Sequence, residues 1–460
     1  MPTLTFHGGA RAVTGANYLI ETETSKVLVD CGLAQGTRHA EKQNYEKFPY
    51  DPVSIDAVLV THAHIDHTGR LPKLVKDGFR GKIFMTRPAR DFVEIMLADS
   101  QALMADEAKS EKEKPLYSKE DVARTLEFIE TAEYGEEVTV TKDIKFRFRD
   151  AGHILGSAII EVWADNQKIV FSGDLGNPPV PLLRPTEFID EADYVVVEST
   201  YGDREHEKLD ERRNLLEDVI EDTFVKGGTL MIPVFALERT QELLYELNSL
   251  IENHRVPRIP IFIDSPLAID ATKIYKKYPE YYNEKAVYLM ESGDQLFQFP
   301  GLKFTYTAVE SKTINDVPPP KIIIAGSGMS NGGRILHHER RYLSDPNSFI
   351  LFIGYQTAGT LGRRIADGEK EVKIFGETVP VRCGVRVIGG YSAHADRAKL
   401  RDWVKNIKEG GTHSAGSGRE LKKVFVVQGE EGPALSFVQL LRDHLGIDAE
   451  APSEGDSVEL

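Results

Sequence analysis

Three histidines and one aspartate fall within six residues of this chain, in the segment HAHIDH at 62–67. The segment follows a short apolar run at 57–60 that is rich in strand-forming residues. Imidazole and carboxylate groups are preferred ligands of zinc, and alternating side chains on a loop at a strand end can converge on one point. This density of ligands indicates a metal site rather than a histidine-rich surface turn.

Two further ligand candidates follow other predicted strands. His153 lies in the segment DAGHILGS, and Asp174 ends the apolar run 168–174. Taken alone, His153 could be a hydrogen-bonded loop residue and Asp174 a strand cap. In open α/β sheets, however, the carboxyl ends of strands gather ligands at one edge, so together these groups favour a shared site.

Short apolar runs alternate with amphipathic segments along most of the chain, and these elements must position the candidate ligands. This alternation predicts an α/β fold with mixed or parallel sheets. Leucine-rich stripes with helical spacing occur at 71–75 and 243–251. The predicted strands are 27–30, 57–60, 168–174, 194–198, 229–234, 259–264, 321–325, 349–354, 385–388 and 423–428.

Three segments are expected to lie outside the core. The highly charged stretch 99–137 should be solvated helix and loop, and the stretch 409–420 is a loop rich in glycine and serine. The acidic tail 449–460 is expected to be frayed.

Composition limits the class of protein. The chain has 460 residues and a formal net charge of −16, a length that suggests two to four domains. Its two cysteines exclude a disulfide framework, and we expect a cytoplasmic location. We expect no membrane association, because no apolar run approaches roughly 20 residues and the N-terminus lacks the pattern of a secretory signal. The acidic balance argues weakly against a general nucleic-acid binder, although basic residues can concentrate in one cleft.

The motif order resembles a known family. HAHIDH, GHILGS and SGDLG resemble the metallo-β-lactamase fold, an α/β four-layer αββα sandwich with a metal site along one sheet edge. Later segments resemble the β-CASP nucleases, which include the cleavage and polyadenylation endonuclease and ribonuclease J: VESTYG at 197–202, GSGMS at 326–330, GTLGR at 359–363 and YSAHAD at 391–396. The resemblance implies a metallo-β-lactamase domain over 1–208 and 384–460, interrupted by an inserted α/β β-CASP domain at 209–383.

The resemblance also implies a site for two zinc ions. One ion would be held by three histidines, the other by an aspartate and a histidine, with a further aspartate bridging both: His62, His64 and His153; Asp66 and His67; and Asp174. Asp30, at the end of the predicted strand 27–30, would orient a ligand histidine through a hydrogen bond. Alternatively, Asp30 begins a turn before Cys31 and Gly32.

The catalytic chemistry follows from the same resemblance. Zinc lowers the pKa of bound water to about 7, so a hydroxide bridging the two ions is the expected nucleophile, with Asp66 among the catalytic residues. His394 would be the general acid, and Glu198 would hydrogen-bond it and raise its pKa. Taken alone, Glu198 could be a solvent-exposed carboxylate at a strand end, and His394 a polar residue at a helix N-terminus capped by Ser392.

One position departs from the family pattern. RNA-acting members carry a histidine where this chain has Gln428, and DNA-acting members usually carry valine. A glutamine oxygen is a weak, hard ligand compared with imidazole. Three interpretations stay open: a second zinc of reduced affinity, a harder metal such as manganese, or weakened catalysis. His413, in the nearby glycine-rich loop, is a remote substitute ligand.

The segment 326–334 is rich in glycine and follows a predicted strand, so its backbone N–H groups could approach a phosphate. We predict substrate contacts from three residues of this loop and from two arginines that could instead form salt bridges: Ser327, Gly328 and Ser330; Arg239 and Arg363. His337 and His338 are expected on a helix surface.

The sequence therefore predicts a zinc-dependent ribonuclease that hydrolyses single-stranded RNA. The β-CASP insert implied by the resemblance would cap the metal cleft with a narrow roof that suits a single strand. Endonucleolytic cleavage to a 3′-hydroxyl and a 5′-phosphate is expected by resemblance, and a homodimer is compatible with the sequence. Two alternatives remain: an RNA-binding subunit with catalysis weakened by Gln428, or a metallo-β-lactamase-fold hydrolase of thioesters, lactones or β-lactams.

Overall fold

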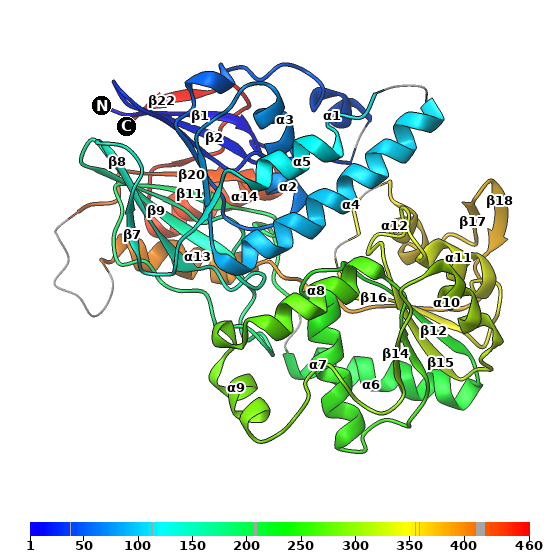
Figure 1. Ribbon diagram of the computed structural model, residues 1–460. Helices are drawn as coiled ribbons and strands as arrows, with labels where there is room; N and C mark the ends of the chain where they lie inside the picture. The colour runs from blue at the N-terminus through cyan, green and yellow to red at the C-terminus, as the bar shows by residue number, and fades with distance from the viewer. Residues whose placement is uncertain (37, 112–113, 207–208, 355, 358, 411–418) are drawn as a thin grey trace. The chain divides into compact units, whose positions relative to one another are not determined.

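Figure 1 shows the chain in a computed structural model, which describes residues 1–36, 38–111, 114–206, 209–354, 356–357, 359–410 and 419–460. The chain divides into two compact units. The first comprises Met1–Pro178, Pro185–Glu205 and His394–Leu460, and the second comprises Pro179–Arg184 and His206–Ala393.

The first unit contains two seven-stranded sheets. One has the order β22 (Ser457–Glu459), β1 (Thr3–Gly8), β2 (Asn17–Glu21), β3 (Lys26–Val29), β4 (Ala57–Leu59), β5 (Lys82–Met85) and β6 (Ile129–Thr131). The other has the order β21 (Ala449–Glu450), β20 (Lys423–Val427), β11 (Tyr194–Glu198), β10 (Gln167–Phe171), β9 (Ala158–Ala164), β8 (Ile144–Asp150) and β7 (Glu137–Thr139). Its helices are α1 (Arg38–Gln43), α2 (Ile65–Thr68), α3 (Leu71–Lys76), α4 (Arg87–Glu111), α5 (Lys119–Leu126), α13 (Arg397–Lys408) and α14 (Glu431–Leu445).

A shared hydrophobic core joins the two sheets of the first unit. Tyr18 of β2 stacks on Phe171 of β10 with ring centroids 6.0 Å apart, and Phe6 of β1 lies 5.2 Å from Phe425 of β20. Along β8, buried and partly exposed residues alternate, because one face of a strand points into this core and the other does not. The opposite face of the second sheet packs against apolar residues of α13 and α14.

The second unit is built on a six-stranded parallel sheet. Its order is β14 (Leu302–Phe304), β13 (Ile261–Ile263), β15 (Lys321–Ala325), β12 (Thr229–Pro233), β16 (Phe349–Phe352) and β19 (Gly384–Val387). The central strands β12 and β15 are buried along their whole length, as continuous apolar runs in parallel sheets usually are. A small hairpin joins β17 (Glu371–Ile374) to β18 (Glu377–Pro380).

The helices of the second unit are α6 (Leu209–Lys226), α7 (Arg239–Glu252), α8 (Pro266–Lys277), α9 (Glu284–Glu291), α10 (Ala308–Thr313), α11 (Ile335–Tyr342) and α12 (Leu361–Ala366). Short 3-10 turns occur in both units: η1 (Pro52–Ser54), η2 (Pro279–Tyr281), η3 (Ile314–Asp316) and η4 (Gly389–Tyr391). Within the described ranges of both units, no helix combines the length and the apolar character needed to cross a membrane.

Each strand predicted from the sequence overlaps an observed strand, and the predictions 194–198 and 321–325 match β11 and β15 end to end. The antiparallel strands β8 and β9 are among those that were not predicted. Alternating charged residues along β8 interrupt the apolar run by which buried strands were recognised.

The expectation of a frayed C-terminal tail is wrong. The tail forms β21 beside β20 and β22 beside β1, and Leu460 is 2% exposed. These acidic residues are ordered by backbone pairing with strands from distant parts of the chain, a contact that local composition does not reveal.

The domain limits at 208/209 and 383/384 stay predictions, whereas the compact units divide at 205/206 and 393/394. Strand β19 pairs with β16, so contacts assign residues 384–393 to the second unit rather than to the C-terminal part of the first.

Gly32 allows two backbone segments to approach closely beside the HAHIDH segment. The neighbouring Cys31 N–H donates to the carbonyl of His67 at 2.8 Å, and a Cβ on Gly32 would overlap the carbonyl oxygen of Asp66. Glycine is therefore required at position 32, because there is no room for a Cβ atom.

We predict that Gly32→Ala destabilises the protein by about 1–3 kcal/mol, the usual cost of overpacking, because the backbone at Asp66 must move. Thermal unfolding followed by circular dichroism measures this as a lower midpoint. The matched control is Gly432→Ala in the exposed first turn of α14, where a Cβ meets nothing within 4 Å and helix propensity improves. Equal midpoints for the two variants would contradict the prediction.

Candidate metal centre

Loops that follow strands of both sheets in the first unit bring the predicted ligands together. His62 lies just beyond β4, and the short helix α2, with His64 as its N-cap, carries Asp66 and His67. His153 follows β8, and Asp174 follows β10. The sequence places these residues at strand ends, and the packing of the two sheets brings the strand ends to one place.

The first group of ligands consists of His62, His64, His153 and Asp174. The Nδ1 atom of His64 lies 3.1 Å from His62 Nε2 and 3.2 Å from His153 Nε2. Asp174 Oδ2 lies 3.4 Å from His62 Nε2 and 3.6 Å from His153 Nε2. A tetrahedral shell with metal–nitrogen distances of about 2.0–2.1 Å has ligand atoms roughly 3.3 Å apart, so this group fits one ion.

The protonation of the first group also suits a metal. Burial, together with the surrounding histidines, lowers the pKa of His64 and of His153 well below the ordinary value. Both imidazoles are therefore neutral near pH 7 and offer the nitrogen lone pairs that a metal requires.

The second group consists of Asp66, His67 and the other oxygen of Asp174. His67 Nε2 lies 3.5 Å from Asp174 Oδ1 and 3.7 Å from Asp66 Oδ2. Asp174 Oδ1 is buried and has no hydrogen-bond partner among the described residues, so it retains an acceptor site for a cation. This arrangement fits the bridging position predicted for Asp174.

The second group carries excess negative charge. Burial alone would lower the pKa of His67, but the carboxylates of Asp174, Asp30 and Asp66 raise it well above the ordinary value. The same carboxylates that attract a proton would attract a divalent cation, so the electrostatics of this group also fit a metal.

Asp30 orients His67. Its carboxylate lies 2.7 Å from His67 Nδ1 and accepts hydrogen bonds of 2.8 Å from both the backbone N–H and the hydroxyl of Thr61. Because Asp30 accepts at Nδ1, a neutral His67 presents its lone pair at Nε2, toward the other ligands. The geometry agrees with the orienting role predicted for Asp30.

Glu198 and His394 form a hydrogen-bonded pair next to Asp174. His394 Nδ1 lies 3.2 Å from Glu198 Oε2 and 3.8 Å from Asp174 Oδ2. Glu198 is fully buried rather than solvent-exposed, and its Oε1 accepts a 2.7 Å hydrogen bond from the N–H of Leu175. Burial alone would lower the pKa of His394, but Glu198 and then Asp174 raise it to about 9, which makes the imidazole a proton donor near pH 7. The N-cap of α13 is Asp396, so the suggested cap at Ser392 is wrong.

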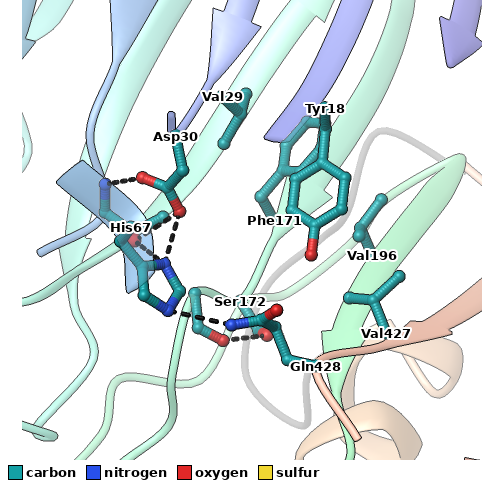
Figure 2. A pocket seen from close by; sticks show the side chains of 11 residues that line it. Tyr18, Val29, Asp30, His67, Phe171, Ser172, Val196, Val427 and Gln428 are labelled. Atoms are coloured by element: carbon teal, nitrogen blue, oxygen red, sulfur yellow. Dashed lines mark hydrogen bonds and ion pairs between the residues drawn. The ribbon is translucent and has the colours of Figure 1, made fainter. Parts of the chain in front are cut away.

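Gln428 lies immediately after β20, and its side-chain amide points toward His67, as Figure 2 shows. Its Nε2 atom is 3.0 Å from His67 Nε2, and its Oε1 is buried without a hydrogen-bond partner among the described residues. The side chain borders a small cavity of about 10 Å³ that Tyr18 and Phe171 also line. The suggested substitute ligand His413 lies outside the described residues.

The residues predicted to bind substrate lie in the second unit. In the glycine-rich loop, Ser327 Oγ accepts hydrogen bonds from the N–H groups of Asn331 and Gly332, at 3.1 and 3.2 Å. A Cβ on Gly328 would lie 2.6 Å from the Phe235 ring, and Ser330 donates to Glu339. Much of the loop's hydrogen bonding is therefore internal, and a phosphate contact there stays a prediction.

The two arginines predicted to contact substrate also have partners within the second unit. Arg363 forms an exposed ion pair of 2.9 Å with Asp367. Arg239 is 5% exposed and bonds the Glu242 carboxylate and the carbonyl of Tyr391. A role of Arg239 in substrate binding stays a prediction, and a phosphate would have to compete with Glu242 for it.

A buried polar network in the second unit was not predicted from the sequence. His338 is 3% exposed and does not lie on the helix surface. Its Nε2 lies 2.7 Å from the Asp264 carboxylate, which also accepts a hydrogen bond of 2.7 Å from Arg334. Burial alone would raise the pKa of Asp264, but these hydrogen bonds lower it to about 2. The available signal was Asp264 itself, an acidic residue that ends the apolar run 259–264.

Family models match three segments of the chain. They are described as the metallo-beta-lactamase superfamily, matched at residues 11–82, the Beta-Casp domain, at 240–365, and the Zn-dependent metallo-hydrolase RNA specificity domain, at 378–452. Together with the mixed α/β architecture, these matches confirm the predicted fold class.

Several curated proteins are similar over most of their length. Ribonuclease TTHA0252 of Thermus thermophilus is 38% identical, with 94% of each chain covered. An RNase J-like protein of Methanocaldococcus jannaschii is 34% identical over 99% of each chain. Transcription termination factor FttA of Methanosarcina mazei is 32% identical over 98% of this chain and 71% of that protein. A crystal structure of an Enterococcus faecalis protein of unknown function superposes with a TM-score of 0.57 at 12% identity over the full length of both chains, a likeness of fold alone.

We predict that Asp30→Asn lowers metal affinity about 10- to 100-fold, the usual effect of removing an orienting carboxylate. The amide has only one acceptor oxygen, and with that oxygen on the Thr61 N–H its NH2 group faces His67 Nδ1. Titration of the metal-free protein with zinc by isothermal calorimetry measures the change. Asp56→Asn is the matched control, since Asp56 accepts from the N–H of Lys26 on the surface. Unchanged affinity in Asp30→Asn would contradict the orienting role.

Proposed function

This chain belongs to the β-CASP family of metallo-β-lactamase-fold proteins, and from that premise we propose that it is a zinc-dependent ribonuclease cleaving single-stranded RNA. The observation that carries the proposal is the contact of two groups through Asp174: a cluster of imidazoles that fits a metal, and the His394–Glu198 pair that holds a proton. A metal-dependent hydrolase needs the first, and protonation of a leaving oxygen needs the second.

The metal centre is proposed to hold two ions, zinc at the first group of ligands and zinc or manganese at the second. The first group of ligands would hold one ion, and Asp66 and His67 would hold the other, with Asp174 bridging. When bound, such ions supply Lewis-acid charge for the phosphate and activate the attacking water. The match to a model described as Zn-dependent, and the three-imidazole group, support zinc.

The chain's own residues position the reacting groups. Asp30 holds His67 in one orientation, and Glu198 holds His394 through Nδ1. His394 Nε2 is therefore the atom that carries the transferable proton. As the P–O3′ bond breaks, this proton passes to O3′ and leaves a 3′-hydroxyl on one fragment and a 5′-phosphate on the other.

RNA as the substrate is supported by the match to the RNA specificity domain and by the ribonuclease names of two relatives. We further propose endonucleolytic cleavage, a preference for single strands owing to the inserted β-CASP domain, and a cytoplasmic location. A homodimer and the absence of membrane partners complete the proposal.

One observation favours a second candidate, an RNA-binding subunit with weakened catalysis. Gln428 Nε2 contacts the His67 nitrogen that a second metal would use. The remaining ligands and the His394–Glu198 pair are in place, so the ribonuclease is the better supported of the two.

An assay with labelled single-stranded RNA, single-stranded DNA and a thioester, each with added zinc or manganese, tests the proposal. RNA cleavage with product ends of 3′-hydroxyl and 5′-phosphate is the expected result. Tight RNA binding without cleavage under either metal would instead identify the binding subunit. Turnover of the thioester alone would overturn the nuclease function.

We predict that His394→Ala reduces the rate of RNA cleavage about 10²- to 10⁴-fold, the usual contribution of a general acid, with little change in metal content. Single-turnover kinetics with saturating enzyme measure the chemical step. His337→Ala, an exposed histidine on α11, serves as the control and should cleave at the normal rate. A similar loss in both variants, or in neither, would contradict the assignment.

We predict that Glu198→Gln moves the alkaline limb of the pH–rate profile to lower pH by about one unit or more. Because Glu198 raises the pKa of His394, the protonated form persists to higher pH, and activity falls as the pH rises through that pKa. Removing the charge lowers the pKa, so the fall begins earlier. An unshifted limb, measured on metal-loaded enzyme, would show that His394 is not the titrating acid.

A further inference from the structure

The two ligand groups that meet at Asp174 differ in their donor atoms. The first group offers three imidazole nitrogens and one carboxylate oxygen, a set suited to zinc. The second offers one imidazole, from His67, and carboxylate oxygens from Asp66 and Asp174. Oxygen-rich sets favour harder ions such as manganese.

The side-chain amide of Gln428 determines which atom is presented to the second group of ligands. When His67 is neutral and its Nδ1–H donates to Asp30, its Nε2 carries a lone pair, and the amide nitrogen of Gln428 lies 3.0 Å from that Nε2. In this state the amide N–H donates to the lone pair that a metal would need. The dashed line from His67 to Gln428 in Figure 2 marks this contact.

The position of Gln428 is closely constrained. Its backbone N–H donates to the Gly9 carbonyl at 2.7 Å, its own carbonyl accepts from Thr200 at 3.1 Å, and its φ of 46° is left-handed. A Cβ on Gly9 would overlap Gln428 Oε1 and would lie 2.6 Å from the hydroxyl of Tyr18. With little room to withdraw, the side chain has one simple alternative, a half-turn of the terminal amide.

A half-turn of the amide exchanges its nitrogen and oxygen. Oε1, which is buried and has no hydrogen-bond partner among the described residues, would then face the second group. The oxygen is a metal ligand, whereas the amide nitrogen is not. The second group would then offer one oxygen each from Gln428, Asp66 and Asp174, together with the imidazole nitrogen of His67.

From this geometry, and resting on the metal centre of the proposed function, we infer that the chain holds a mixed-metal centre. Zinc occupies the three-histidine group, and a harder, more exchangeable ion such as manganese occupies the second group with the Gln428 amide oxygen as a ligand. Gln428 thus sets the metal specificity of the second position.

Metal analysis of the full-length protein tests the inference without relying on activity. The protein is stripped with a chelator, given one equivalent of zinc chloride and then excess manganese chloride, freed of unbound ions and analysed by mass spectrometry. About one zinc and one manganese per chain are expected. Two zinc ions bound with equal affinity in a zinc titration, or retention of one zinc and no manganese, would overturn the inference.

Variants of Gln428 sharpen the test. Gln428→His should shift the second position to zinc and abolish manganese retention, whereas Gln428→Glu should tighten manganese binding about tenfold or more by adding a carboxylate. Manganese electron paramagnetic resonance measures that affinity even if one variant fails to fold. Gln167→His, on β10 where the side chain contacts Lys422, is the control and should bind metals as the unaltered chain does.

Manganese binding unchanged in both Gln428 variants would overturn the role of Gln428. If the metal contents are as expected but RNA is not cleaved under any loading, the proposed ribonuclease function fails while the mixed-metal centre stands. The two ideas therefore fail separately.

Discussion

Buried negative charge is the constraint on which the rest of the site depends. The carboxylates of Asp30, Asp174 and Glu198 are at most 3% exposed, and a buried carboxylate is costly unless it is paired. Asp30 and Glu198 have imidazole and N–H partners, but one oxygen of Asp174 lacks a hydrogen bond within the described ranges. A cation between the two ligand groups would satisfy it. The same charge keeps His394 protonated, so one electrostatic feature serves both metal binding and proton donation.

The scaffold concentrates this charge by packing one sheet on another. Tyr18 and Phe171 meet in the core that joins the sheets, and Asp30 and Asp174 follow strands on opposite sides of that core. Because the core is apolar, the carboxylates near its edge are poorly solvated and bind cations strongly. Packing energy thus holds the ligands in a geometry that they would not adopt alone.

Gln428 makes the two halves of the metal centre unequal. A histidine there would supply another imidazole to the second group, whereas glutamine supplies either a hydrogen-bond donor or an oxygen. The choice between these depends on the orientation of one amide that is otherwise tightly packed against Gly9. A single substitution can therefore alter which metal binds without disturbing the fold around it.

The sequence by itself determined the features that depend on neighbouring residues. The HAHIDH segment after an apolar run, and strands such as β11 and β15, were recognisable because strand periodicity and ligand spacing are local properties. The motif order also made the family recognisable, and with it the pairing of Glu198 with His394. Only the tertiary structure decided the contacts between distant segments: β22 with β1, the burial of His338, and Gln428 with His67, which are 361 residues apart. Such contacts depend on how the sheets pack, and no local pattern encodes whether the nitrogen or the oxygen of a side-chain amide will face an imidazole.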